Sequence, residues 1–298
     1  IQVEFEYADR NYLNANLYLS QELEFNQRLK LRVSAFQNSD AKNSQINQEL
    51  DDQQIQFLAG LGDSVQRAFY PAAVIDSFAA GKILYEKIYV GLDSFYRYST
   101  DPSLAKYNLS FVDLGQGNGN YIPDFNGANG KVYSFVAPVG TVKQGQYEPV
   151  RVLVAPGKQQ VVDLGIDYKI GSSTLLKAEV ATSNKDVNTF SSKDDGDDRG
   201  WAAKFQLSND KLLSSSRKLL LVTSLDYEYV QQKFRPLERL RTVEFSRDWG
   251  LNLQPVPVPV DENIIRAAAK LKDNKNHSFS YQFTNYRRSD DYSGVQNA

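Results

Sequence analysis

The feature that most constrains this chain is a strict alternation of apolar and polar side chains within residues 159–184. An extended strand places successive side chains on opposite faces. One face would therefore carry apolar side chains: Val162, Leu164, Ile166, Tyr168 and Ile170. The other face would carry polar or small ones: Asp163, Gly165, Asp167 and Lys169. The pattern predicts a long strand whose two faces meet different surroundings.

The same alternation recurs along most of the chain. It is present in the following stretches: 1–7, 28–33, 201–207, 219–229, 265–271 and 278–284. We count roughly a dozen or more strands from this pattern. The sequence therefore predicts an all-β fold of antiparallel strands.

One segment, at about residues 50–70, departs from the alternation and indicates a short helical insertion. Asp51 suits the N-cap, and Gly60 and Gly62 indicate that the helix is short or broken. Apolar residues recur at helical spacings up to Pro71, which would end the helix: Ile55, Leu58, Val65 and Phe69. Two interpretations stay open, an ordinary helix packed on a sheet or an insertion that plugs or covers something.

The composition changes near Pro156. We predict a β-rich region over residues 1–155, which holds the helical insertion and a Gly/Asn-rich loop at 113–130. A barrel-like region of long hairpins would follow over residues 156–298. The chain opens in mid-strand pattern and contains no Met, so we expect a processed chain or a piece of a longer protein.

Composition excludes several classes of function. The formal net charge is −2 and no basic stripe is present, so we expect no nucleic-acid partner. Without cysteine, the chain has no disulfide, thiolate metal site or cysteine nucleophile. Its one histidine, His277, lies in a polar turn and cannot assemble a triad or a histidine metal site. We expect no enzyme, no cofactor, and neither a transmembrane helix nor a signal peptide, because no long apolar run is present.

Three weaker patterns have a structural and a functional interpretation each. The glycines at 115, 117 and 119 favour turns, because neither a P-loop ending nor a following helix accompanies them. Oxygen ligands for calcium occur nearby, at a spacing that matches no known loop: Asp113, Asp124, Asn126 and Asn129. A second acidic run favours a solvated loop over a cation site: Asp194, Asp195, Asp197 and Asp198.

Two environments explain the alternating strands. In a soluble sandwich the apolar face meets a core, and in an outer-membrane barrel it meets lipid while the polar face lines a wet lumen. Strand length favours the barrel, because crossing a bilayer takes about 9–11 residues, against about 5–6 in soluble sheets. The strand-like stretches at 161–170, 174–183 and 217–230 reach or exceed this range.

The connections also favour a barrel, because their lengths follow the order short, long, intermediate, long, short. The short ones are 171–173 and 273–276, the intermediate one is 208–217, and the long ones are 184–199 and 231–262. Short turns on the inner side and long loops outside are typical of outer-membrane barrels. Aromatic residues near strand ends suit the two interfaces: Tyr168, Trp201, Tyr227, Tyr229 and Tyr281.

In such a barrel, Leu164, Ile166 and Tyr168 would face lipid, and charged residues would face the lumen and pair across neighbouring strands. The lumen-facing candidates are Asp163, Asp167, Lys169, Lys177, Glu179, Lys204, Asp226, Glu228, Arg266 and Lys270. They would tune what passes or docks.

Two motifs carry a resemblance to a known class of proteins. "RTVEFSRDWGL" at 241–251 and "GQGNGNYIPDFNGANGKVYSFVAP" at 115–138 resemble segments of very large envelope β-proteins of Bacteroidetes-type bacteria. The second half of the chain is similar to their outer-membrane barrel region. The resemblance implies the cell envelope, and transport, secretion or surface display, and it carries over no catalytic residue.

These observations together predict part of an outer-membrane β-barrel in a Gram-negative bacterium. Its partners would be the lipid bilayer and other envelope proteins. The alternative is a soluble, secreted or cell-surface β-sandwich that binds glycan or a protein through exposed aromatic residues.

Overall fold

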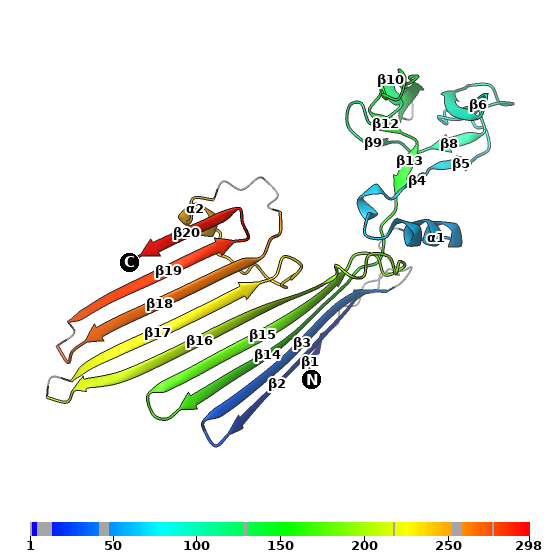
Figure 1. Cartoon of the computed structure of the whole chain (residues 1–298). Helices are drawn as coiled ribbons and strands as arrows, with labels where there is room; N and C mark the ends of the chain where they lie inside the picture. The colour runs from blue at the N-terminus through cyan, green and yellow to red at the C-terminus, as the bar shows by residue number, and fades with distance from the viewer. Residues whose placement is uncertain are drawn as a thin grey trace. The chain divides into compact units, whose positions relative to one another are not determined.

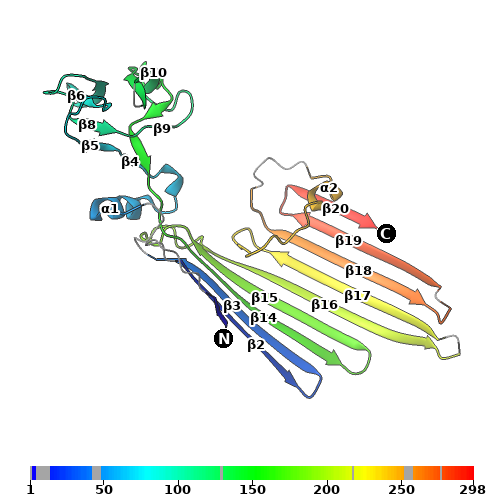
Figure 2. The same ribbon diagram turned by 180° about the vertical axis from the view of Figure 1, so that it is seen from behind.

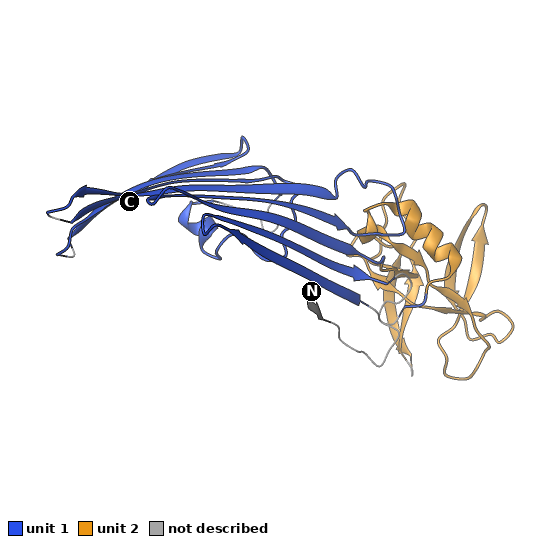
Figure 3. Cartoon of the chain, turned by 90° about the horizontal axis from the view of Figure 1, so that it is seen from below, with its two compact units in different colours: residues 1–49, 155–298 blue, residues 50–154 orange. Residues whose placement is uncertain are grey.

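The computed structural model describes residues 2–4, 14–41, 48–127, 130–216, 218–251, 258–275 and 277–298. The chain forms two compact units, one of Ile1–Glu49 with Ala155–Ala298 and one of Leu50–Val154 (Figure 3). The boundary near residue 155 agrees with the composition change. The grouping differs from the predicted division into 1–155 and 156–298, because residues 29–39 pair with residues 158–168 and so join the first strands to the later hairpins.

Unit 1 is a ten-stranded antiparallel sheet, which together with unit 2 makes the chain all-β. Its strands, in sheet order, are β1 (Gln2–Glu4), β2 (Asn14–Phe25), β3 (Leu29–Asp40), β14 (Lys158–Ile170), β15 (Thr174–Asp186), β16 (Arg199–Ser214), β17 (Leu219–Val230), β18 (Glu262–Lys272), β19 (Ser278–Arg288) and β20 (Tyr292–Asn297). The sheet is open: β1 and β20 are its edges, and the described strands do not close into a barrel (Figure 1).

The strands in the middle of this sheet are long. Each strand of this sheet between the two edge strands β1 and β20 has 11 to 16 residues. The prediction of strands longer than the usual soluble length is therefore confirmed. The stretch 208–217, read as a link of intermediate length, is instead mostly strand, because β16 continues to Ser214 against β17.

The links between consecutive strands gather at two ends of the sheet. At one end lie the tight turns at 26–28, 171–173, 215–218 and 273–277 (Figure 2). At the other end lie residues 41–157, which carry unit 2, then 187–198, 231–261 and the short turn 289–291. The links predicted to be short, 171–173 and 273–276, lie at the first end, and those predicted to be long, 184–199 and 231–262, lie at the second. The turn 289–291 is short and yet lies at the second end. Arg217 and Asn276 lie outside the described residues.

Unit 2 combines one helix with small antiparallel sheets. The elements are α1 (Asp52–Leu61), the 3-10 turn η1 (Val65–Arg67), β4 (Phe69–Pro71), β5 (Ala73–Ile75), β6 (Tyr85–Val90), β7 (Asp93–Tyr98), β8 (Tyr107–Leu109), β9 (Val112–Asp113), β10 (Tyr121–Gly127), β11 (Gly130–Phe135), β12 (Tyr147–Glu148) and β13 (Val150–Val152). Strands pair in the orders β5-β8-β6-β7, β11-β10-β12-β9 and β13-β4. Buried aromatic side chains form much of the core: Tyr85 and Tyr121 are almost fully covered.

The predicted helical insertion exists, but it is shorter than its apolar spacing indicates. Asp51 is the N-cap, and its side chain accepts a hydrogen bond from the backbone N of Gln54 at 2.9 Å. The helix ends at Gly62, whose φ of 61° leaves the helical region. Phe69 lies in β4 and not in a helix, so Pro71 does not mark its end. In the part of the chain that the structure describes, no helix is both long and apolar enough to cross a membrane.

The Gly/Asn-rich stretch at 113–130 is also more ordered than a loop. It contains β10, which forms a hairpin with β11, although residues 128 and 129 lie outside the described residues. Gly119 forms an isolated bridge with Gly145. A Cβ on Gly119 would lie 2.4 Å from the carbonyl oxygen of Tyr147, so glycine permits this close approach of two backbones.

Candidate functional site

Strand register places all ten predicted lumen-facing residues on one face of the unit 1 sheet, which we call the polar face. Residues directly opposite one another in antiparallel strands share a face. Lys177 lies opposite Asp167, and the same row continues through Gln206 and Asp226 to Arg266. A second row runs from Gly165 through the residues Glu179, Lys204 and Glu228. Alternation along the strands adds the remaining candidates to the same face: Asp163, Lys169 and Lys270.

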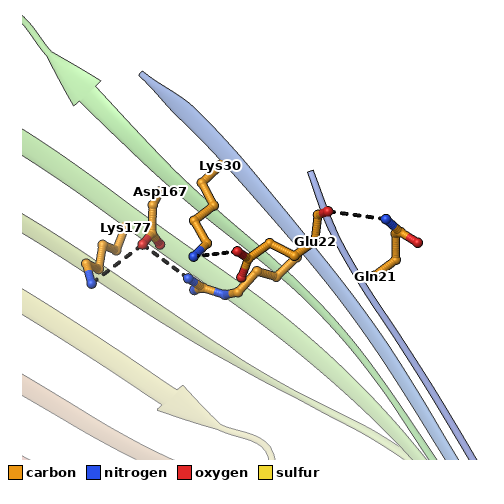
Figure 4. A network of polar contacts seen from close by, with 6 residues as sticks. Gln21, Glu22, Lys30, Asp167 and Lys177 are labelled. Atoms are coloured by element: carbon orange, nitrogen blue, oxygen red, sulfur yellow. Dashed lines mark hydrogen bonds and ion pairs between the residues drawn. The ribbon is translucent and has the colours of Figure 1, made fainter. Parts of the chain in front are cut away.

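A network of charges lies on this face across β2, β3, β14 and β15 (Figure 4). Asp167 is its centre: its Oδ2 lies 3.1 Å from Nη1 of Arg32 and 3.6 Å from Nζ of Lys177. Farther out, Nζ of Lys30 lies 2.7 Å from Oε1 of Glu22. These are strand-to-strand pairs, so the network joins four neighbouring strands through their side chains.

Small residues allow the charges to approach closely. A Cβ on Gly165 would lie 3.0 Å from Nη2 of Arg32, so the guanidinium lies over this glycine. Ser34 donates from Oγ to Oδ1 of Asp163 at 3.0 Å. The alternation of Asp and Gly in β14 therefore supplies both the acceptor and the space for the arginine of β3.

The predicted pairing of charges across strands is confirmed for Asp167 with Lys177. Glu228 differs, because its partner is Arg241, which comes from a link and not from a strand. For the other candidates, among the described residues, we find no ion pair within 4.0 Å: Asp163, Lys169, Glu179, Lys204, Asp226, Arg266 and Lys270.

Part of the long link between β17 and β18 lies on the polar face. We call residues 231–251 the inner segment. Its first turn packs on Gly200, where a Cβ would lie 2.1 Å from the backbone N of Phe234. Phe234 is buried, and the backbone N of Arg235 donates to Oγ of the buried Ser183 at 2.8 Å. Gly200 and Ser183 lie directly opposite each other on this face.

Farther along the inner segment, Arg241 reaches two carboxylates of the sheet. Its Nη1 pairs with Glu228, and its Nη2 lies 2.8 Å from Oε2 of Glu262. Burial lowers the pKa of Arg241, but the two carboxylates raise it by more, so its pKa lies above the ordinary value. The guanidinium is therefore charged throughout the physiological range and links the inner segment to β17 and β18.

The end of the inner segment packs aromatic rings on the same face. Helix α2 (Phe245–Asp248) places Phe245 and Trp249 against Tyr286 of β19, at centroid distances of 5.1 Å and 5.3 Å. In Figures 1 and 2 this stretch lies beside β18, β19 and β20. A Cβ on Gly294 of β20 would lie 3.0 Å from the Trp249 ring, so the ring covers that glycine.

A cavity of about 530 Å³ separates parts of the inner segment from the sheet. Its lining includes Phe234, Arg235, Arg241, Phe245, Tyr286 and Arg288. The inner segment is therefore attached at a few points, and a continuous apolar core does not hold it.

The opposite face of the sheet, which we call the apolar face, is largely uncovered. Register confirms that Leu164, Ile166 and Tyr168 share it, and the side chains of Leu164, Val180 and Leu225 are 46%, 52% and 45% exposed. A contiguous apolar surface of this kind on a protein marks a site of contact with another protein or with a membrane.

Aromatic residues lie on the apolar face near both ends of the strands. Trp201, Tyr227 and Tyr229 lie towards the end with the long links, and the Trp201 and Tyr229 rings are 4.6 Å apart. Tyr168 and Tyr281 lie towards the tight turns. The rows of these two groups are adjacent, because Tyr227 shares a row with Ile166 and Tyr168 lies in the next row.

The weaker sequence patterns do not assemble into a site. His277 lies in a turn with its Nδ1 2.9 Å from Oδ2 of Asp273. Gly115 and Gly117 have φ values of 86° and 80°, which turns require. Within the described ranges, no group of three or more acidic or histidine side chains could hold a metal ion, and Asn129 lies outside those ranges.

The sequence pattern left several residues of the polar face unassigned. Lys30 and Arg32 alternate with apolar residues in β3, and this signal was sufficient to place them beside the other candidates. Arg241 and Ser183 carry no such signal, because a residue in a link has no strand periodicity and a serine does not reveal its partner. The chain matches no protein-family model, no curated protein and no solved structure.

Proposed function

We propose that this chain forms part of an outer-membrane β-barrel of a Gram-negative bacterium, in which it serves transport, secretion or surface display. The observation that carries the proposal is the two-faced sheet. One face is apolar and exposed over long antiparallel strands, and the other carries all ten predicted charged residues. In a barrel the first face meets lipid and the second lines the lumen.

The exposure of the apolar face favours lipid over a sandwich core. A soluble sandwich buries this face against a second sheet about 10 Å away. Tyr168 and Val180, in the middle strands, are instead 41% and 52% exposed. Aromatic side chains near the strand ends suit the interfaces of a bilayer.

A barrel also requires pairing at the free edges of β1 and β20. Unpaired backbone groups are too costly in hydrocarbon for an open edge to face lipid. The proposal therefore includes further strands on both edges, from the same chain or from other envelope proteins. The polar face would then select the molecules that pass by their charge and their size. The proposal includes no catalysis, no cofactor and no nucleic-acid partner.

The bacterial group in the proposal rests on the resemblance of residues 115–138 and 241–251 to Bacteroidetes-type envelope proteins. That resemblance agrees with the class proposed from the two-faced sheet. It does not identify a cargo.

Sidedness provides the test of this proposal, since a cysteine-free chain gives a clean background for labelling. A single cysteine at Ser192, in the link between β15 and β16, should react with a membrane-impermeant maleimide on intact cells. Cysteines at Ser172 or Asn274, in the tight turns, should react only after the outer membrane is opened. Equal labelling of all three on a protein released without detergent would contradict the proposal and favour the soluble sandwich.

A further inference from the structure

We propose that the inner segment is a constriction of the lumen and that Arg241 is the residue that positions it. This inference rests on the proposed function, because a segment on the polar face narrows a passage only if that face lines one. It goes further by assigning the size limit of the passage to one link and the position of that link to one side chain.

The geometry separates the inner segment from an ordinary surface loop. Residues 231–251 follow β17 at the end of the sheet where the long links lie, yet Phe234, Arg241 and Trp249 all contact polar-face residues. A solvated loop would leave this face open. The inner segment instead covers the ends of β16 to β20 on the side opposite the apolar face.

Arg241 is the contact that joins the middle of the inner segment to the sheet. It carries hydrogen bonds to Glu228 of β17 and Glu262 of β18, which lie two residues apart in register because Glu262 is opposite Val230. Charge-assisted hydrogen bonds of this kind are stronger than neutral ones. Its removal leaves two partly buried carboxylates without a counter-ion, and release of the inner segment lets water solvate them.

The cavity behind the inner segment makes release feasible without loss of the sheet. The 530 Å³ space is lined by Phe234, by Arg241 and by Phe245 of α2, so it extends between the contacts that hold the inner segment. The ladder hydrogen bonds of β17 with β18 do not depend on the guanidinium. We therefore expect Arg241→Gln to free the inner segment while the strands stay paired.

The two tryptophans of the chain allow this to be measured. Trp249 lies on the inner segment and Trp201 on the apolar face, so the variant Trp201→Phe leaves Trp249 as a single fluorescent reporter. In protein extracted from its own outer membrane with any partner strands retained, Arg241→Gln should shift Trp249 emission to the red and increase its quenching by acrylamide. Arg239→Gln, an exposed arginine two residues away, is the matched control and should change neither property. Unchanged Trp249 quenching in Arg241→Gln would overturn the positioning role.

A second pair of variants tests the same attachment without altering charge. Gly200→Ala places a Cβ against the backbone of Phe234 and should also release Trp249. Gly196→Ala, where a Cβ meets nothing within 4 Å, is its control. Protection of Trp249 in Gly200→Ala equal to that in Gly196→Ala would contradict a role of the Phe234 contact in holding the inner segment in place.

Passage is measured on the same preparations in liposomes, by the entry rates of neutral sugars of increasing size. Arg241→Gln should admit larger sugars than Arg239→Gln admits. Release of Trp249 without any change in the size limit would overturn the constriction and leave the barrel standing. A chain that does not enter the bilayer at all would overturn the proposed function and the constriction together, whereas the Trp249 result in detergent would still decide the role of Arg241.

Discussion

Asp40 and Gly157 bind each other at the point where unit 2 leaves and rejoins the sheet. The backbone N of Asp40 donates to the carbonyl oxygen of Gly157 at 3.0 Å, and the backbone N of Gly157 donates to Oδ2 of Asp40 at 2.9 Å. These residues end β3 and precede β14, which are neighbours in the sheet. Unit 2 is thus an insertion between two paired strands, and its removal leaves their ends in contact.

We therefore predict that replacing residues 42–154 by a short glycine-serine link leaves the ten-stranded sheet intact. Folding of this shortened chain into lipid vesicles, followed by circular dichroism and by heat-dependent migration on gels, should match that of the intact chain. The same deletion with Asp40→Ala should fold less well, because Gly157 and Asn14 lose the carboxylate that accepts their hydrogen bonds. A shortened chain without β-structure would contradict the independence of the two units.

A charge on the apolar face should be more costly than the same charge on the polar face. Arg in place of Ile166, near the middle of β14, should lower the free energy of unfolding in bilayers by about 2–4 kcal/mol. Gln206→Arg is the matched control, since Gln206 lies on the polar face between Lys177 and Asp226. Urea titrations in vesicles measure both, and equal losses for the two variants would exclude a lipid-facing apolar side.

The pair of Arg32 with Asp167 should contribute little to stability by itself. Its side chains are 37% and 17% exposed, and partly exposed pairs contribute about 0.2–1 kcal/mol in double-mutant cycles. A cycle with Arg32→Gln and Asp167→Asn should give a coupling energy in that range. A much larger value would mean that the polar face excludes water and has no wet lumen beside it.

Unit 2 should lose stability in strong alkali because of Tyr121. Burial raises the pKa of Tyr121 to about 12, above the ordinary value of 10.0. Since the neutral phenol is favoured by the folded state, its contribution is complete below pH 10 and is lost as the pH rises towards 12. Burial also raises the pKa of Tyr85, so an absorbance titration of phenolate should show more than one late-ionising tyrosine, and one fewer in Tyr121→Phe.

The same variant separates this effect from the hydrogen bond of the phenol. Tyr121→Phe removes the bond that the backbone N of Tyr96 donates to the hydroxyl at 2.8 Å, so it should be less stable at neutral pH by about 1 kcal/mol. Its remaining loss of stability above pH 10 should be smaller than that of the parent. An unchanged alkaline loss would show that Tyr121 is not its source.

Two glycines of unit 2 should respond in opposite ways to alanine. Gly119→Ala should be strongly destabilising, because its Cβ would meet the backbone of Tyr147. Gly60→Ala should be neutral or stabilising by about 0.5–1 kcal/mol, since Gly60 lies in α1 with nothing within 4 Å of its Cβ. Thermal unfolding followed by near-ultraviolet circular dichroism measures both, and a tolerated Gly119→Ala would contradict the close backbone approach at Gly145.

The strands could be predicted from the sequence because period-2 alternation is a local property. Each of the ten charged candidates reveals its face through its immediate neighbours, and that assignment needs no knowledge of the partner strand. Strand pairing is not local: Ser34 and Asp163 are 129 residues apart and yet form a hydrogen bond. For this reason the sequence-based division of the chain assigned β2 and β3 to the wrong region.

The parts that the sequence could not predict lie in links and at element ends. Gly62 ends α1 through its backbone conformation, whereas the apolar spacing continues to Phe69. Arg241 finds its two carboxylates only because the link turns back onto the polar face, and no spacing in the sequence encodes that turn. Links carry few periodic constraints, so their destination depends on tertiary contacts.

The most direct test of a lipid-facing apolar side uses Trp201 in the variant Trp249→Phe. Trp201 lies on that face, near the start of β16, and is 44% exposed. In vesicles of lipids that carry bromine on the acyl chains near the headgroups, its fluorescence should be strongly quenched, while acrylamide in the water phase quenches it weakly. Strong quenching of Trp201 by acrylamide with no quenching by brominated lipid would contradict a barrel whose apolar face meets the bilayer.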